Sequence, residues 1–207
     1  MRAQLGILAL QGDFAKHQTM LRSLRIETVL VKKPEDLDVC AGLIIPGGES
    51  TTLTKLLRQG NLNEPIRNFA LSKPIMGTCA GAILLSSVVD DERIKPLQLI
   101  DISTERNAYG RQIDSFITQV DATFLPGSER FKAVFIRAPK IGSVGPEVEV
   151  LMKLDGSPIM VQGNNILALT FHPELTNDAR IHRYFLEQFL PSRANLKVAG
   201  PLQGKRS

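Results

Sequence analysis

Residues 74–81 of this chain are PIMGTCAG, a short apolar run that ends in a Gly-x-Cys-x-Gly turn. Apolar residues 82–85 follow at once, with the pattern of a helix. Glycines on both sides of Cys79 permit a sharp, strained turn, which lifts the cysteine side chain clear of the sheet. The N–H groups of a helix N-terminus favour negative charge, and therefore thiolate over thiol. The stretch thus predicts a nucleophilic cysteine at a strand-to-helix elbow.

A cysteine nucleophile needs a general base, and His172 is the best candidate among three histidines. It ends an apolar run over residues 167–171, and the next residue, Pro173, cannot continue a sheet ladder. Glu174 lies close enough in sequence to accept a hydrogen bond from the imidazole and fix its tautomer. The three residue types supply nucleophile, base and orienting carboxylate. The alternative is a buried structural cysteine with an incidental histidine.

Strand and helix patterns alternate along the first half of the chain. We expect strands at residues 5–10, 28–31, 43–46 and 75–78, with helices at 14–24, 53–57 and 66–71. Strands at 116–120, 133–137, 148–154, 159–162 and 166–171 follow, and then a last helix, capped by Asn177 or Asp178, that runs to about residue 190.

This order predicts an α/β fold: one three-layer domain with a mostly parallel, doubly wound central sheet. Ligands of such sheets bind outside the carboxyl ends of the strands. Gln11, Gly47 and Cys79 each follow a strand and should therefore meet at one rim.

Composition favours one domain, which we expect at residues 1–190 of the 207, followed by a basic tail at 191–207. The tail accounts for the whole net charge of +4 and has no acid; its cations are Arg193, Lys197, Lys205 and Arg206. We expect this tail to be a solvated, mobile end. Without interleaved aromatic residues, the excess positive charge is no signal for nucleic acid.

Other classes of protein are disfavoured as well. No apolar run approaches the roughly 18 residues that span a bilayer, and the N-terminus leads directly into a strand instead of a secretory signal. Two cysteines in unlike contexts are typical of a reducing compartment, so we expect a cytoplasmic protein. No Cys/His spacing predicts zinc and no phosphate loop is found, so neither metal nor cofactor is expected.

Taken together, these motifs carry a resemblance to a known family. The elbow at residues 77–81, PGGEST at 46–51 and FHPE at 171–174 resemble the class I, triad-type glutamine amidotransferases, whose fold is flavodoxin-like. LQG at 10–12, ERNAYGRQIDSF at 105–116 and FIRAP at 135–139 resemble, more narrowly, the glutaminase subunits of pyridoxal 5'-phosphate synthases. The resemblance runs from about residue 4 to about residue 190.

The resemblance implies hydrolysis of L-glutamine through Cys79, His172 and Glu174, with the ammonia passed to a partner synthase subunit. The backbone N–H groups of Ala80 and Gly48 would form the oxyanion hole, since glycines let a backbone approach closely. For Gly47 and Gly48 alone, a plain strand-to-helix turn capped by Ser50 or Thr51 is the alternative. The expected glutamine-binding residues are Gly47, Gly48, Glu49, Arg106, Ile136 and Arg137.

Two other functions stay open at this level. The chain could serve another amidotransferase, such as one of histidine or anthranilate synthesis, or be a catalytically silent binding subunit. Three further residues are expected to be structural. Cys40 should pack in the core, His17 at the core edge or an interface, and His182 on the solvated face of the last helix.

Overall fold

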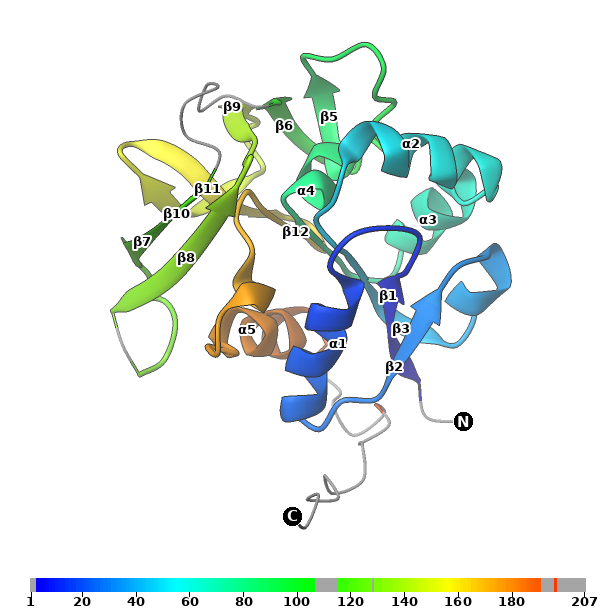
Figure 1. Cartoon of the computed structure of the whole chain (residues 1–207), viewed down its shortest axis with the longest axis horizontal. Helices are drawn as coiled ribbons and strands as arrows, with labels where there is room; N and C mark the ends of the chain where they lie inside the picture. The colour runs from blue at the N-terminus through cyan, green and yellow to red at the C-terminus, as the bar shows by residue number, and fades with distance from the viewer. Residues whose placement is uncertain (1–2, 107–114, 128, 191–195, 197–207) are drawn as a thin grey trace.

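The computed structural model describes residues 3–106, 115–127, 129–190 and 196, and a seven-stranded sheet forms its centre (Figure 1). Five neighbouring strands are parallel, and two antiparallel strands extend one edge. In spatial order the strands are β10 (Glu149–Leu154), β11 (Ser157–Gly163), β12 (Ile166–Leu169), β4 (Ile75–Thr78), β3 (Cys40–Ile45), β1 (Gln4–Leu8) and β2 (Thr28–Val31). The parallel part has the flavodoxin-like order, which reverses direction between β1 and β3.

The central strands are buried on both faces, because their side chains alternate between two separate hydrophobic cores. In β3, Leu43 and Ile45 belong to one core, whereas Ile44 belongs to the other. In β4, Ile75 and Met76 divide in the same way. Continuous apolar runs therefore mark these strands in the sequence.

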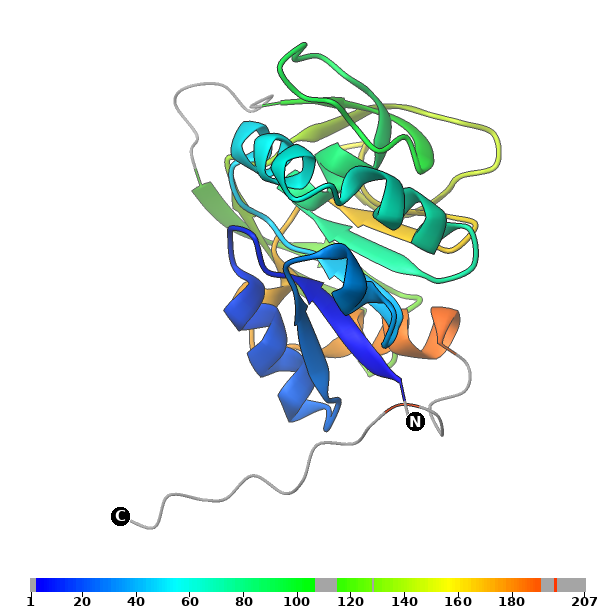
Figure 2. The ribbon, with the colours of Figure 1, turned by 90° about the vertical axis from the view of Figure 1, so that its right-hand side faces the viewer.

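Helices cover the two faces of the sheet in two layers (Figure 2). One layer contains α2 (Ser50–Gln59), α3 (Asn63–Ala70) and α4 (Ala80–Leu85); the other contains α1 (Phe14–Ser23) and α5 (Arg180–Phe189). Short 3-10 helices occur as η1 (Pro34–Leu37) and η2 (Pro173–Leu175). No helix in the described part of the chain has the length and apolar character needed to cross a lipid bilayer. The α/β fold with a mostly parallel sheet is as predicted.

Smaller sheets flank this centre. β7 (Ser115–Asp121) and β8 (Arg130–Ile136) form a hairpin, whereas β5 (Ser86–Val89), β6 (Ile100–Glu105) and β9 (Lys140–Val144) form a three-stranded sheet. The sequence analysis missed β5, β6 and β9. β6 alternates buried and exposed residues, but its partners lie far away in sequence, so its pairing carries no local turn signal.

The last helix also begins later than predicted. Its N-cap is Ala179, whereas Asp178 uses its carboxylate to accept the backbone N–H and the guanidinium of Arg180. The other turn predictions fit better. Asp155 and Asn164 both adopt positive φ in the turns that join β10, β11 and β12, as Asp-Gly and Asn-Asn signals favour.

The expectation of a solvated C-terminal end does not hold at Leu196. This side chain is 2% exposed, packs into the core that contains α1 and α5, and forms a parallel bridge with Ala3. The other residues from 191 to 207 lie outside the described part of the chain.

Leu196 leads to a truncation prediction. Removing residues 197–207 should leave the melting temperature unchanged, whereas removing 193–207 should lower it. Burying a leucine contributes about 2 kcal/mol, which corresponds to about 4–8 °C for a chain of this size. Thermal unfolding of both truncations, with Leu196→Ala in the full chain as control, makes the test. Equal melting temperatures for the two truncations would contradict it.

Candidate active site

The elbow places Cys79 between the end of β4 and the start of α4. Its backbone is strained, with φ 50° and ψ −108°, a conformation that residues with a Cβ rarely adopt. The Cys79 N–H donates to Leu169 O at 2.8 Å, which ties the elbow to the end of β12. The sulfur lies 3.7 Å from Ile136 O. The turn thus directs the thiol toward the segments that follow β12 and β8.

Both glycines of the elbow are required by close packing. A Cβ on Gly81 would overlap with Ile45 O of β3, and one on Gly77 would lie 2.7 Å from the carbonyl carbon of Gly81. A larger residue at either position would push α4 away from the sheet. The Gly-x-Cys-x-Gly spacing is therefore explained by helix–strand contact as well as by the turn.

His172 and Glu174 lie next to this elbow because β12 pairs with β4 and ends beside it. His172 N–H donates to Val134 O at 2.8 Å, and His172 Nδ1 is 2.7 Å from Glu174 Oε1. Both side chains are buried. Burial lowers the pKa of His172, but the neighbouring Cys79 and Glu174 raise it to about 10. The arrangement therefore favours an imidazolium when the cysteine is a thiolate.

Gly47 fits between the side chains of Cys79 and His172. A Cβ there would overlap with His172 Cε1 and lie 3.3 Å from Cys79 Cβ, so only glycine can occupy this position without displacing one of them. The Gly47 N–H donates to Thr78 Oγ1 at 3.1 Å. The following peptide is held by the loop after β1, since Gln11 Oε1 accepts the Glu49 N–H at 2.9 Å.

Glu49 and Arg106 form an ion pair through Glu49 Oε1 and Arg106 Nη2. Glu49 also caps α2, because its carboxylate accepts the N–H groups of Thr51 and Thr52 at 3.2 and 2.7 Å. Burial raises the pKa of Glu49, but the hydrogen bonds from these threonines lower it to about 2. Arg106 Nη1 lies 3.0 Å from Asp91 Oδ2, an acid that the sequence analysis did not single out.

Ile136 ends β8 beside the sulfur of Cys79, and Arg137 is the next residue. The contact from Ile136 is made by its carbonyl oxygen, whereas its side chain is 38% exposed. Arg137 adopts a positive φ of 43°, which marks a strained backbone next to the site. Six of the residues expected at the site, Gly47, Glu49, Cys79, Ile136, His172 and Glu174, thus come from four separate segments of the chain.

His17 and His182 are placed differently from what the sequence suggested. Both are fully buried, so the expectation that His182 is solvated was wrong. The sequence did contain a signal for this burial, because each histidine lies at helical spacing from the apolar residues of the buried face. His17 precedes Met20 and Leu21 on α1, and His182 precedes Phe185 and Leu186 on α5.

A group of potential metal ligands falls on the same site. Ligand atoms of Asp13, His172 and Glu174 lie within 4.8 Å of one another. Two of the three residues already bond to each other as base and carboxylate. A cation there would occupy the base, so we interpret the group as part of the triad.

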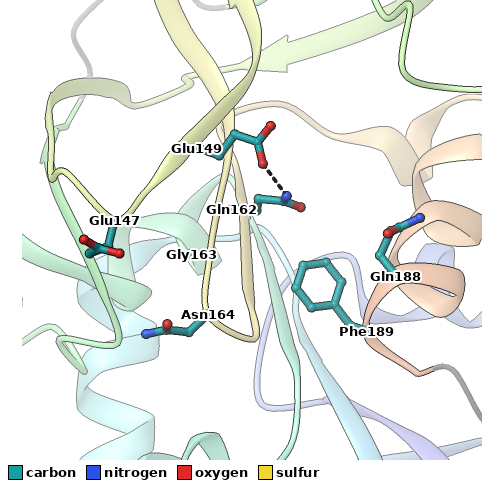
Figure 3. Close-up of a pocket in the computed structure, with 7 residues that line it drawn as sticks. All are labelled: Glu147, Glu149, Gln162, Gly163, Asn164, Gln188 and Phe189. Carbon is teal, nitrogen blue, oxygen red and sulfur yellow. Dashed lines mark hydrogen bonds between the residues drawn. The ribbon is translucent and has the colours of Figure 1, made fainter.

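A cavity of about 300 Å³ lies beside the antiparallel edge of the sheet (Figure 3). Polar side chains line it from the β10–β11 hairpin and from the end of α5, among them Glu149, Gln162 and Gln188. No triad residue lines this cavity. Its lining includes no cysteine or histidine, so it has no counterpart of the Cys79–His172 arrangement, and we place the chemistry at the elbow.

Comparison with known proteins agrees with this assignment. Residues 7–191 match the SNO glutamine amidotransferase family. The chain is 47% identical to pyridoxal 5'-phosphate synthase subunit PdxT of Thermotoga petrophila over 185 residues, which cover 89% of this chain and 98% of the relative. It is 50% identical to the protein of the same name from Dictyoglomus turgidum, with the same coverage.

A solved structure described as a glutamine amidotransferase superposes with a TM-score of 0.82 at 44% identity, covering 88% of this chain and 97% of that one. The elbow cysteine, the buried His–Glu pair and these relatives all point the same way: the chain belongs to the SNO glutamine amidotransferase family.

Proposed function

We propose that this chain is the glutaminase subunit of a pyridoxal 5'-phosphate synthase, and that it passes ammonia from L-glutamine to a synthase subunit. The observation that carries the proposal is the convergence of Cys79 with the His172–Glu174 pair at one end of the sheet. The names of its relatives support the choice of pathway. Both cysteines are free of disulfides, which suits the reducing cytoplasm that we propose as its location.

In the first half-reaction, Cys79 Sγ attacks the side-chain amide carbon of glutamine while His172 Nε2 takes the thiol proton. Nε2 is buried and has no hydrogen-bond partner within the described chain, so it is available for this transfer. The tetrahedral intermediate collapses, the C–N bond breaks, and His172 returns the proton to the leaving ammonia. Water then attacks the thioester with His172 as base, releasing glutamate and the thiol.

Negative charge on the tetrahedral oxygen needs preorganised donors. We assign the N–H groups of Ala80 and Gly48 to this role, since Gly47 N–H is already bonded to Thr78. The substrate is a zwitterion, so one acid and one base should hold its α-amino and α-carboxylate groups. Glu49 and Arg106 are an adjacent pair of this kind, with the Gly47–Gly48 backbone, Ile136 and Arg137 completing the pocket.

The test is glutamine labelled with ¹⁵N in its side-chain amide, supplied to the purified chain together with the synthase subunit. We expect glutamate release, and ¹⁵N in pyridoxal 5'-phosphate. Glutamate release without transfer of the label would support a different synthase partner, such as one of histidine or anthranilate synthesis. If neither glutamate nor labelled pyridoxal 5'-phosphate were formed, the chain would be a catalytically silent binding subunit.

Arg106 gives a prediction on substrate affinity. Replacing it by glutamine removes a charge-assisted hydrogen bond to the substrate carboxylate, worth about 1.5–3 kcal/mol. We therefore expect KM for glutamine to rise about 10- to 100-fold, with a smaller change in kcat. Arg93→Gln is the matched control, because Arg93 pairs with the same Asp91 but is 73% exposed. An unchanged KM in Arg106→Gln would remove Arg106 from the binding site.

A further inference from the structure

All three histidines of the chain lie in one buried row that passes through the carboxylate of Glu174. His182 Nε2 is 2.9 Å from His17 Nδ1, and His17 Nε2 is 3.4 Å from Glu174 Oε2. Glu174 Oε1 completes the row at His172. The residues come from α1, α5 and the segment after β12, so only the tertiary fold joins them. The catalytic steps above use neither His17 nor His182.

Burial decides which atoms of this row carry protons. Desolvation, together with its histidine neighbours, holds the pKa of His17 well below its usual range, and burial alone lowers the pKa of His182 to about 3. Each ring is therefore neutral and carries one N–H. Glu174 as a carboxylate accepts only, and its Oε2 is buried with no hydrogen-bond partner in the described chain. His17 Nε2 lies 3.4 Å from this oxygen, as a polar contact without hydrogen-bond geometry.

One assignment of the protons on His17 and His182 satisfies the most hydrogen-bonding groups in this row. If His17 carries its proton on Nε2, it donates to Thr78 Oγ1 at 3.2 Å, and the same N–H lies 3.4 Å from Glu174 Oε2, where its dipole favours the negative charge. His17 Nδ1 is then an acceptor for the Nε2–H of His182. His182 Nδ1, which is buried with no partner in the described residues, is left as a lone pair. The opposite tautomers would bury an unpaired N–H there and turn a lone pair of His17 toward the carboxylate, which costs more.

Thr78 connects this row of histidines to the loop that contains Gly47 and Gly48. Its hydroxyl oxygen accepts the Gly47 N–H at 3.1 Å as well as facing His17. The charged or titratable groups around His17 are thus His182, His172 and Glu174, with Asp13 close to the latter two. One neutral imidazole links the catalytic carboxylate to the loop that contains Gly47.

We propose that His17 is a positioning residue for the glutaminase reaction: its Nε2–H fixes the Glu174 carboxylate against His172, and His182 sets the tautomer of His17. The proposal rests on the glutaminase function proposed above. Without this N–H beside Glu174 Oε2, the carboxylate is free to turn and to release His172 Nδ1. The imidazolium of His172 then loses its counter-charge, which weakens the ion pair that it forms with a Cys79 thiolate.

The experiment compares His17→Leu with His17→Gln, since glutamine carries an N–H₂ group where Nε2 lies. Both are made in full-length chain with Cys40→Ala, so that iodoacetamide can alkylate only Cys79. For His17→Leu we expect alkylation about tenfold slower near neutral pH, converging on the parent rate at high pH as the thiolate forms without assistance. Glutaminase kcat with the synthase subunit should fall about 10- to 100-fold, with KM little changed. His17→Gln should recover most of both losses.

Ser86→Ala is the matched control, because it removes a buried hydrogen bond, to Thr104, from the other core of the fold. It should change neither readout per folded molecule. A His17→Leu protein that remains folded by thermal melting but keeps the parent alkylation profile and kcat would overturn the proposal. So would equal losses in the leucine and glutamine variants.

A measurement on the unmodified chain covers the case in which the variants do not fold. With three ¹⁵N-labelled histidines, ¹H–¹⁵N spectra identify each tautomer, and His182→Gln assigns one of the signals. We expect neutral His17 protonated on Nε2; a proton on Nδ1 would overturn the proposal. Alkylation and tautomer are both measured without glutamine, so they test the positioning of Glu174 even if the glutaminase function itself proved wrong.

Discussion

Replacing Cys79 by alanine is expected to lower glutaminase turnover by about four to six decades, as loss of a nucleophile typically does. The side chain is the only sulfur at the elbow, and its strained backbone holds it against Gly47 and His172. The measurement is steady-state glutamate release by the chain in complex with its synthase subunit. A glutamine-analogue affinity label should also add its mass to the peptide that contains Cys79.

Cys40→Ala is the matched control for this experiment. Cys40 is buried in β3, and its thiol donates to Asp36 O at 3.1 Å. Burial raises the pKa of Cys40 to about 11, so the thiol is neutral at physiological pH. Most of the activity should survive its removal. Comparable activity in the Cys79 and Cys40 variants would show that the elbow cysteine is not the nucleophile.

The second large effect is activation by the partner. We expect the isolated chain to be nearly idle, and saturation with the synthase subunit to raise turnover by about two to three decades, the contribution of one oxyanion donor. The Gly47–Gly48 loop, which would supply this donor, is held by hydrogen bonds to the loop after β1. Asp13 N–H lies 3.4 Å from Gly47 O, and Gln11 Oε1 accepts the Glu49 N–H. A partner that contacts the loop after β1 would therefore reorient the Gly47–Gly48 peptide.

Titration of the synthase subunit into the chain at fixed glutamine makes this test, with the Cys79→Ala chain giving the background rate. A rate that climbs and saturates with partner concentration is the expected result. Full turnover by the isolated chain, unaltered by saturating partner, would refute the activation and weaken the assignment to pyridoxal 5'-phosphate synthesis with it.

Much of the site is encoded locally and was predicted from the sequence. The turn around Cys79 needs its two glycines within two residues on either side. Pro173 starts the short η2 helix directly after His172. The alternation of apolar strands and amphipathic helices predicted the parallel sheet. That sheet in turn predicted that Gln11, Gly47 and Cys79 follow strands at one rim. These features depend on neighbours along the chain, whose spacing a sequence displays directly.

Other features depend on residues that are neighbours only in space. The ion pair between Glu49 and Arg106 joins segments 57 residues apart, and the contact between His17 and His182 joins segments 165 residues apart. Leu196 is buried because it forms a bridge with Ala3, next to β1, and its side chain packs into the core below. No local pattern specifies such contacts.

The sequence by itself therefore determined the fold class and the elbow, and it suggested the nucleophile, base and acid that we propose. Only the tertiary structure decided which polar side chains are desolvated together. A buried imidazole or carboxylate must find its partner among whatever groups the packing of helices on the sheet brings within hydrogen-bond distance. For Glu174 the packing of α1 brings His17 to its second oxygen.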